Sequence, residues 1–160
     1  MKKILSTLLL IFAIATAAQA QFSQGTKYVS TSLSGLNMSY SDKSEFRIGL
    51  NADGGYFIAD CVLLRGSVGF NHYSKNNDEV TLGVGARYYF LQNGISLGTG
   101  MEYSHISPNI NDLRIPFELG YTFYLNHYIA IEPALYYKMS LNDFTKGSEV
   151  GFRLGLGFYF

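Results

Sequence analysis

The chain has 160 residues, with 12 basic and 12 acidic side chains, one cysteine, 17 glycines, 13 tyrosines and 12 phenylalanines. This length suits a single domain, and a balanced charge without basic runs argues against a nucleic-acid binder that is held by phosphate contacts. A lone cysteine excludes an intrachain disulfide framework and a Cys-rich metal site, while abundant glycine and aromatic residues are typical of β proteins.

Residues 1–20 have the features of a secretory signal peptide. Two lysines near the start precede an apolar run over residues 8–15, and the small residues Ala18 and Ala20 stand before Gln21. The apolar run is too short for a membrane-spanning helix, which needs about 20 apolar residues. We therefore expect cleavage before Gln21, with an uncleaved anchor as the alternative.

Residues 21–160 are expected to form one domain of eight strands, because apolar and polar residues alternate with period 2 between turn-forming clusters. Pro116 and Pro133 fall inside expected strands, and each is expected at a local bulge or a lost hydrogen bond. The expected strands are Lys27–Tyr40, Ser44–Phe57, Asp60–Tyr73, Asp78–Phe90, Gly94–His105, Asn111–Leu125, His127–Leu141 and Ser148–Phe160. Tight corners are expected at Ile58-Ala59 and Leu125-Asn126.

One parity of each strand carries large apolar side chains, and the other carries the mid-strand charges. The first strand departs from this pattern, and a bulge near Gly35 would reconcile its two halves. A soluble barrel would place the apolar face inward. Most glycines share the charged parity, however, and an eight-stranded barrel is too narrow to hold the large apolar side chains. The glycines therefore favour an outward apolar face that contacts lipid, with aromatic girdles near both rims.

The sequence ends in GFRLGLGFYF, an alternating strand with an aromatic carboxy-terminal residue. This ending resembles the assembly signal of bacterial outer-membrane β-barrels, and the mature chain resembles the small outer-membrane barrel proteins (OmpX/OmpA-like) of Bacteroidetes-type bacteria. The resemblance implies an all-β, eight-stranded antiparallel up-and-down transmembrane barrel in the outer membrane, with both termini in the periplasm. It also implies recognition by the barrel-insertion machinery through Phe152, Leu154, Leu156, Phe158 and Phe160.

The charges of the inward parity are nearly balanced, as expected when buried charges are paired to offset desolvation. We expect a polar plug in a non-enzymatic envelope or surface-interaction protein, with a small-solute pore as an alternative. We expect no cofactor, a monomer, and contacts with outer-membrane lipids and lipopolysaccharide. The expected interior network comprises Arg47, Arg65, Arg87, Glu102, Arg114, Glu118, Glu132, Lys138 and Arg153. Counting from the turns places Arg47, Arg114, Lys138 and Arg153 in its outer half.

Two His-x-Ser motifs, His72 to Ser74 and His105 to Ser107, occur at the outer ends of strands. They are similar to the lipid-facing His and Ser of lipid A deacylase barrels, in which the histidine is the general base and the serine is the nucleophile. This similarity makes a lipid-modifying enzyme that uses His105 and Ser107 the second alternative. The nearby acids of the sixth expected strand fall on the inward parity, which argues against a completed triad.

Overall fold

The computed structural model describes residues 22–39, 47–73, 77–90, 94–106, 110–142 and 147–160, with side chains except at 35–39, 47, 48, 73, 77, 106 and 110. Arg47 is therefore described in its backbone alone, and the predicted cleavage site at Ala18, Ala20 and Gln21 lies outside these ranges. Within them, no helix is long and apolar enough to cross a membrane.

Antiparallel strands form a closed eight-stranded barrel, which confirms the predicted fold class. Each strand pairs with its neighbours in sequence, β1 pairs with β9, and β6 and β7 together form the sixth strand. The strands are β1 (Lys27–Ser39), β2 (Arg47–Ala59), β3 (Val62–Tyr73), β4 (Asn77–Tyr89), β5 (Ile95–Ile106), β6 (Ile110–Tyr121), β7 (Phe123–Tyr124), β8 (Ile129–Ser140) and β9 (Glu149–Tyr159).

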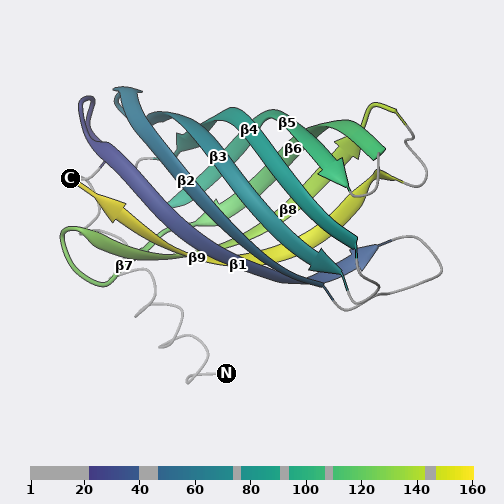
Figure 1. Ribbon diagram of the computed structural model, residues 1–160. Helices are drawn as coiled ribbons and strands as arrows, with labels where there is room; N and C mark the ends of the chain where they lie inside the picture. The colour runs from purple at the N-terminus through teal and green to yellow at the C-terminus, as the bar shows by residue number, and fades with distance from the viewer. Residues whose placement is uncertain (1–21, 40–46, 74–76, 91–93, 107–109, 143–146) are drawn as a thin grey trace, which may run out of the picture.

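The two ends of the barrel can be distinguished by the parts of the chain that lie there. The start of β1 and the end of β9 lie together at the left in Figure 1, near the β7–β8 hairpin. Lys27 and Phe160 exchange backbone hydrogen bonds there, with N–O distances of 2.6 and 3.0 Å. We call this the terminal end. The opposite end, where β1–β2, β3–β4, β5–β6 and β8–β9 are connected, is called the loop end.

The sixth strand of the barrel is interrupted at Thr122, although the sequence pattern predicts one continuous strand. β6 and β7 keep one register against β8, which places Tyr121 opposite Pro133 beside the break. Proline has no N–H to donate, so the ladder between the two strands loses a hydrogen bond at this position. Pro133 thus interrupts the hydrogen bonding without shifting the register.

Pro116 has a similar effect between β5 and β6. Thr99 pairs with Phe117 and Glu102 pairs with Arg114, but no pairing is present between these two points. The register is the same on both sides of the gap, so Pro116 marks lost hydrogen bonds rather than a bulge.

The predicted bulge in the first strand is confirmed, because the register between β1 and β9 shifts between Ser34 and Leu36. The predicted corner at Ile58-Ala59 is wrong. β2 continues to Ala59 through a register shift against β3, and the chain turns after it, where Cys61 has a φ of 64°. The irregular pairing at Ile58 lengthens the strand beyond the point where its alternation ends.

The large apolar side chains of the strands are exposed on the outside of the barrel, as their parity predicts. The glycines differ between the two faces. A Cβ atom at inward Gly85 would lie 2.5 Å from the carbonyl oxygen of Thr99, whereas one at outward Gly54 would meet no atom within 4 Å. Glycine is therefore needed at Gly85 because the lumen is closely packed. The sequence pattern indicated the same reason for the inward glycines, namely that an eight-stranded barrel is narrow.

Candidate functional site

Glu118 lies in the middle of the lumen and accepts hydrogen bonds from arginines on three other strands. Its carboxylate oxygens are 2.7 Å from Nη2 of Arg65 on β3, 2.7 Å from Nη2 of Arg87 on β4 and 2.7 Å from Nη2 of Arg153 on β9. All four side chains are largely shielded from solvent. Because hydrogen bonds between ionised groups are strong where water is excluded, Glu118 links separate parts of the barrel wall across the lumen.

Glu132 on β8 extends this network toward the terminal end. Its Oε2 is 3.1 Å from Nη1 of Arg87 and accepts a hydrogen bond of 2.6 Å from the Tyr28 hydroxyl. Its Oε1 accepts a hydrogen bond of 2.5 Å from the Tyr159 hydroxyl, and Arg87 also donates to Tyr89. These tyrosines satisfy the buried charges with their hydroxyls and turn their rings toward the terminal end.

Asp53 on β2 completes what we call the central cluster, which consists of Asp53, Arg65, Arg87, Glu118, Glu132 and Arg153. The contacts of Asp53 with the arginines are longer: 3.8 Å from Oδ1 to Nη1 of Arg65, and 3.9 Å from Oδ2 to Nη1 of Arg153. Ser30 donates a hydrogen bond of 3.1 Å to Oδ2. Asp53 Oδ1 and Arg65 Nη1 have no direct hydrogen-bond partner within the described chain.

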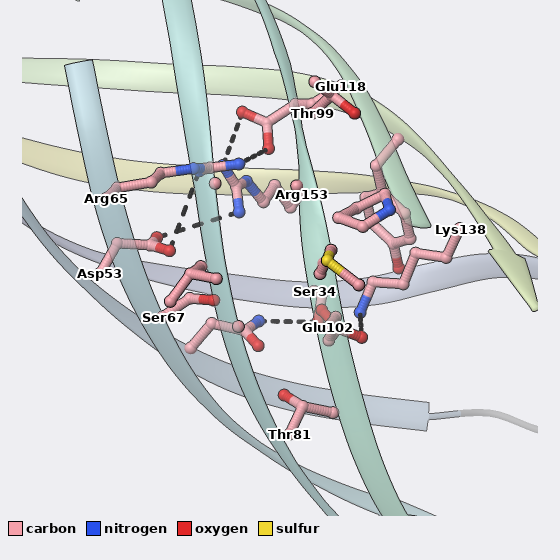
Figure 2. Close-up of a pocket in the computed structure, with 18 residues that line it drawn as sticks. Ser34, Asp53, Arg65, Ser67, Thr81, Thr99, Glu102, Glu118, Lys138 and Arg153 are labelled. Carbon is pink, nitrogen blue, oxygen red and sulfur yellow. Dashed lines mark hydrogen bonds and ion pairs between the residues drawn. The ribbon is translucent and has the colours of Figure 1, made fainter. Parts of the chain in front are cut away.

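A small cavity adjoins Asp53, and Figure 2 shows Asp53, Arg65, Arg153 and Glu118 converging at one side of it. The volume that water can occupy in this cavity is about 50 Å³. The cavity extends toward Glu102 and Lys138, and hydroxyl groups contribute to its wall. Its size and polar lining suit a few water molecules rather than a larger solute.

A second group of ion pairs lies nearer the loop end. Arg114 is 2.8 Å from both Glu79 and Asp112, and Lys138 Nζ is 2.7 Å from Glu102 and 3.8 Å from Glu149. Polar neighbours add hydrogen bonds to these acids: Asn71 and Ser104 donate to Glu79, and Ser140 donates to Asp112. In this loop-end cluster, the carboxylates of Glu79 and Asp112 are thus held by both a cation and neutral donors.

The structure brings most of the predicted interior residues together, with one difference in placement. The side chains of Arg65, Arg87, Glu118 and Glu132 meet in the central cluster, and those of Glu102, Arg114 and Lys138 in the loop-end cluster. Arg153 belongs to the central cluster rather than to the outer half, because its long side chain reaches Glu118. The Arg47 side chain lies outside the described residues.

Alternation assigns several tyrosines to the inward parity, among them Tyr89 and Tyr159, which are buried, but three other rings of the lumen were not identified from the sequence. Tyr28 and Phe57 are buried at the terminal end, and so is Phe22, which precedes β1. The parity of Tyr28 and Phe57 matches that of Ser30 and Asp53, so alternation alone was sufficient to place these two rings inside. No periodic signal covers Phe22.

The histidines of the two His-x-Ser motifs lie on the outer face near the loop end. His72 Nδ1 is 2.7 Å from Asp78 Oδ1, and His105 Nδ1 is 2.7 Å from Asn111 Oδ1. The partner of His105 is therefore an amide rather than a carboxylate. Ser74 and Ser107 lie outside the described residues, so the structure does not place a nucleophile beside either histidine.

The outward face of β9 and the end of the chain carry the proposed assembly signal, and all five of its side chains are exposed: Phe152, Leu154, Leu156, Phe158 and Phe160. Within the described ranges, no group of three or more His, Cys, Asp or Glu side chains has an arrangement that could hold a metal ion.

Comparison with known proteins identifies the fold. The N-terminal β-barrel domain of Pseudomonas aeruginosa OprF aligns with a TM-score of 0.68 at 18% identity, covering 86% of this chain and 98% of that domain. Neisserial surface protein A aligns with a TM-score of 0.65 at 14% identity, covering 86% of this chain and 98% of that protein. A de novo designed transmembrane β-barrel aligns with a TM-score of 0.56 at 12% identity, covering 88% of this chain and 99% of the design.

No family model and no curated protein matches the sequence. At these low identities the structural matches establish the fold and not the activity, and a designed barrel shares that fold with natural surface proteins. The chain has the fold of the small integral outer-membrane β-barrel proteins.

Proposed function

We propose that this chain is a non-enzymatic integral protein of the bacterial outer membrane, with a structural role in the envelope or a role in surface interaction. The observation that supports this most is the contrast between its two faces. Large apolar side chains are exposed around a closed barrel, while the lumen is filled by paired charges. A closed ring leaves no backbone edge unpaired in lipid, and an apolar exterior is what a bilayer requires.

Fractionation and gel mobility test the membrane assignment. The protein is expected in the outer-membrane fraction, and it is expected to migrate differently before and after boiling, because closed barrels resist unfolding in detergent. Recovery in the soluble periplasmic fraction, with no heat-dependent shift, would refute the proposal.

The proposal includes an orientation and a set of partners. Both termini lie in the periplasm, the loop end faces the cell exterior, and the outer face contacts membrane lipids and lipopolysaccharide as a monomer. The barrel-insertion machinery recognises the last strand, β9, together with the Phe160 that follows it, as in the OmpX/OmpA-like proteins of Bacteroidetes-type bacteria. An epitope inserted between residues 143 and 146 is expected to be labelled on intact cells, while one appended after Phe160 is labelled only after permeabilisation.

A pore for small solutes is the first alternative. The central cluster fills the middle of the lumen, and the adjoining cavity is suited to only a few water molecules. We therefore expect no single-channel steps from the purified protein in a planar bilayer. Regular conductance steps would favour the pore.

A lipid-modifying hydrolase is the second alternative, carried by His105 and Ser107. The hydrogen bond between His105 and Asn111 fixes the ring without providing the carboxylate that would stabilise a protonated histidine. Mass spectrometry of lipid A from cells with and without the protein separates the two cases. Loss of an acyl chain that depends on His105 would establish the enzyme.

A further inference from the structure

The lumen at the terminal end is filled by apolar side chains instead of ion pairs. Tyr28, Phe57, Leu63, Tyr89 and Tyr159 are all buried there, and each comes from a different strand. Rings packed across a narrow mouth exclude water from the polar groups that lie behind them. The terminal end is therefore the part of the barrel where a seal against water can be located.

One ring of this layer comes from outside the strands. Phe22 precedes β1, yet its side chain is only 4% exposed. It stacks on Tyr89 with a centroid distance of 4.2 Å and an interplanar angle of 25°. Its centroid also lies 5.8 Å from Tyr124, 6.0 Å from Phe57 and 6.1 Å from Tyr159. Phe22 thus contacts rings from several sides of the barrel at once.

Backbone and side-chain hydrogen bonds fix the segment that carries Phe22. The carbonyl oxygen of Phe22 accepts a hydrogen bond of 2.7 Å from the amide of Cys61, in the turn between β2 and β3. The amide of Gln24 donates to Asp60 Oδ1 at 2.8 Å, and its side chain donates to the carbonyl of Ile58 at 3.0 Å. The segment before β1 is therefore attached to the β2–β3 turn at the terminal end.

We propose that Phe22–Gly25 is a stopper that seals the terminal end of the lumen. The Phe22 ring closes the aromatic layer on the terminal-end side of Arg87 and Glu132, so that water and ions have no path from this end to the buried charges. The cavity beside Asp53 is then a blind pocket with respect to the terminal end. This inference goes beyond the proposed function, since it assigns a barrier role to a segment outside the strands.

The stopper lies beside the N-terminus that is expected for the mature protein. Cleavage before Gln21, as the sequence predicts, would leave Phe22 as the second residue of the mature protein. A ring so close to a free chain end can enter the mouth of the barrel after the strands have closed, because no long segment has to pass with it. The mature N-terminus would then contribute to the seal of the lumen.

Cys61 provides a reporter of this seal. Its side chain is 2% exposed and belongs to the same buried cluster as Phe22. Burial and the nearby Asp60 carboxylate raise the pKa of the thiol, so it reacts slowly while it is covered. The experiment is to follow labelling of Cys61 by a charged methanethiosulfonate in the folded, processed protein in detergent micelles. Phe22→Ala is expected to raise the labelling rate at least about tenfold, because local opening exposes the thiol.

Matched variants separate a lost seal from general destabilisation. Phe123→Ala removes a ring on the outer face near the same end and is expected to leave the labelling rate unchanged. Phe22→Leu keeps apolar volume in the mouth and is expected to label more slowly than Phe22→Ala, and it carries the test if Phe22→Ala loses the folded band. Equal labelling rates for wild type and the folded Phe22 variants would overturn the proposal. Because the measurement is made in micelles, it does not depend on the membrane location of the protein.

Discussion

The two halves of the lumen share one strand parity but are filled by different chemistry. Toward the loop end and the middle, charged side chains pair across the barrel, with Glu118 bound by three arginines. At the terminal end, rings such as Tyr89 and Phe57 pack with a centroid distance of 5.4 Å, and their cluster contains no ion pair among the described residues. The inward parity therefore requires side chains that satisfy one another, and either ions or rings can meet that requirement.

The tyrosines at the border show how the two halves are joined. The hydroxyls of Tyr28 and Tyr159 donate hydrogen bonds to Glu132, and the centroids of their rings lie 5.2 Å apart in the aromatic layer. Each side chain thus satisfies a buried carboxylate at one end and packs against apolar groups at the other. The border needs residues of this kind, because a charge placed directly against phenylalanine would lack a partner.

The largest effect is expected from breaking the charged half at Glu118. Glu118→Leu leaves Arg65, Arg87 and Arg153 without their shared carboxylate, and removal of one partner from a buried pair costs about 3–5 kcal/mol. We expect the folded band on a gel to be lost at a clearly lower temperature than in the wild type. Glu118→Gln keeps one acceptor oxygen for the arginines and is expected to lose less. An unchanged transition for Glu118→Leu would mean that the charges do not hold the barrel together.

A somewhat smaller loss is expected from the aromatic half. Phe57→Ala removes a fully buried ring and leaves a cavity, at a cost of about 3 kcal/mol. The matched control is Phe117→Ala on β6, where the ring is 47% exposed on the outer face and its loss is expected to cost well below that. Urea unfolding of the detergent-folded protein measures both. Similar losses for the two variants would contradict the assignment of Phe57 to a packed layer.

Alternation was sufficient to predict the barrel, because each residue of a strand has only two directions to point. It correctly assigned the charges of Arg87 and Glu132 to the lumen and the side chains of Leu82 and Leu154 to the outside. It also identified the bulge near Gly35, because a change of parity within one strand requires an extra residue. These features depend on local sequence alone.

The partners within the lumen could not be predicted in the same way. Glu118 on β6 meets Arg153 on β9 and Arg65 on β3, and such contacts depend on strand tilt and on side-chain length across the barrel. Strand order leaves both quantities open. Phe22 was missed for a different reason: it precedes the first strand, where no periodicity indicates which way a ring points.

The inward and outward glycines provide a third test of the difference between the inner and outer faces of the barrel, with a smaller expected change in the free energy of unfolding. Gly85→Ala would place a Cβ atom 2.5 Å from the carbonyl oxygen of Thr99, and a forced backbone shift costs about 1–3 kcal/mol. Gly54→Ala on the outer face meets no atom within 4 Å, so it is expected to be neutral or to stabilise by about 0.5 kcal/mol through the unfolded chain. Thermal transitions of the two variants should therefore move in different directions or by clearly different amounts. Equal destabilisation would show that the lumen is not tightly packed.

The smallest effect is expected at Lys138, and it tests whether charge alone or burial of charge matters in the lumen. Lys138→Met breaks a 2.7 Å contact with Glu102, but both side chains keep partial access to solvent, at 13% and 11%. Water can replace part of the lost interaction, so the cost is expected to be about 1–2 kcal/mol, below that of Glu118→Leu. Lys27→Met, at the exposed start of β1, serves as the control without a change. If Lys138→Met cost as much as Glu118→Leu, the partial solvent access of the Lys138–Glu102 pair would not lower the free energy that an ion pair contributes in the lumen.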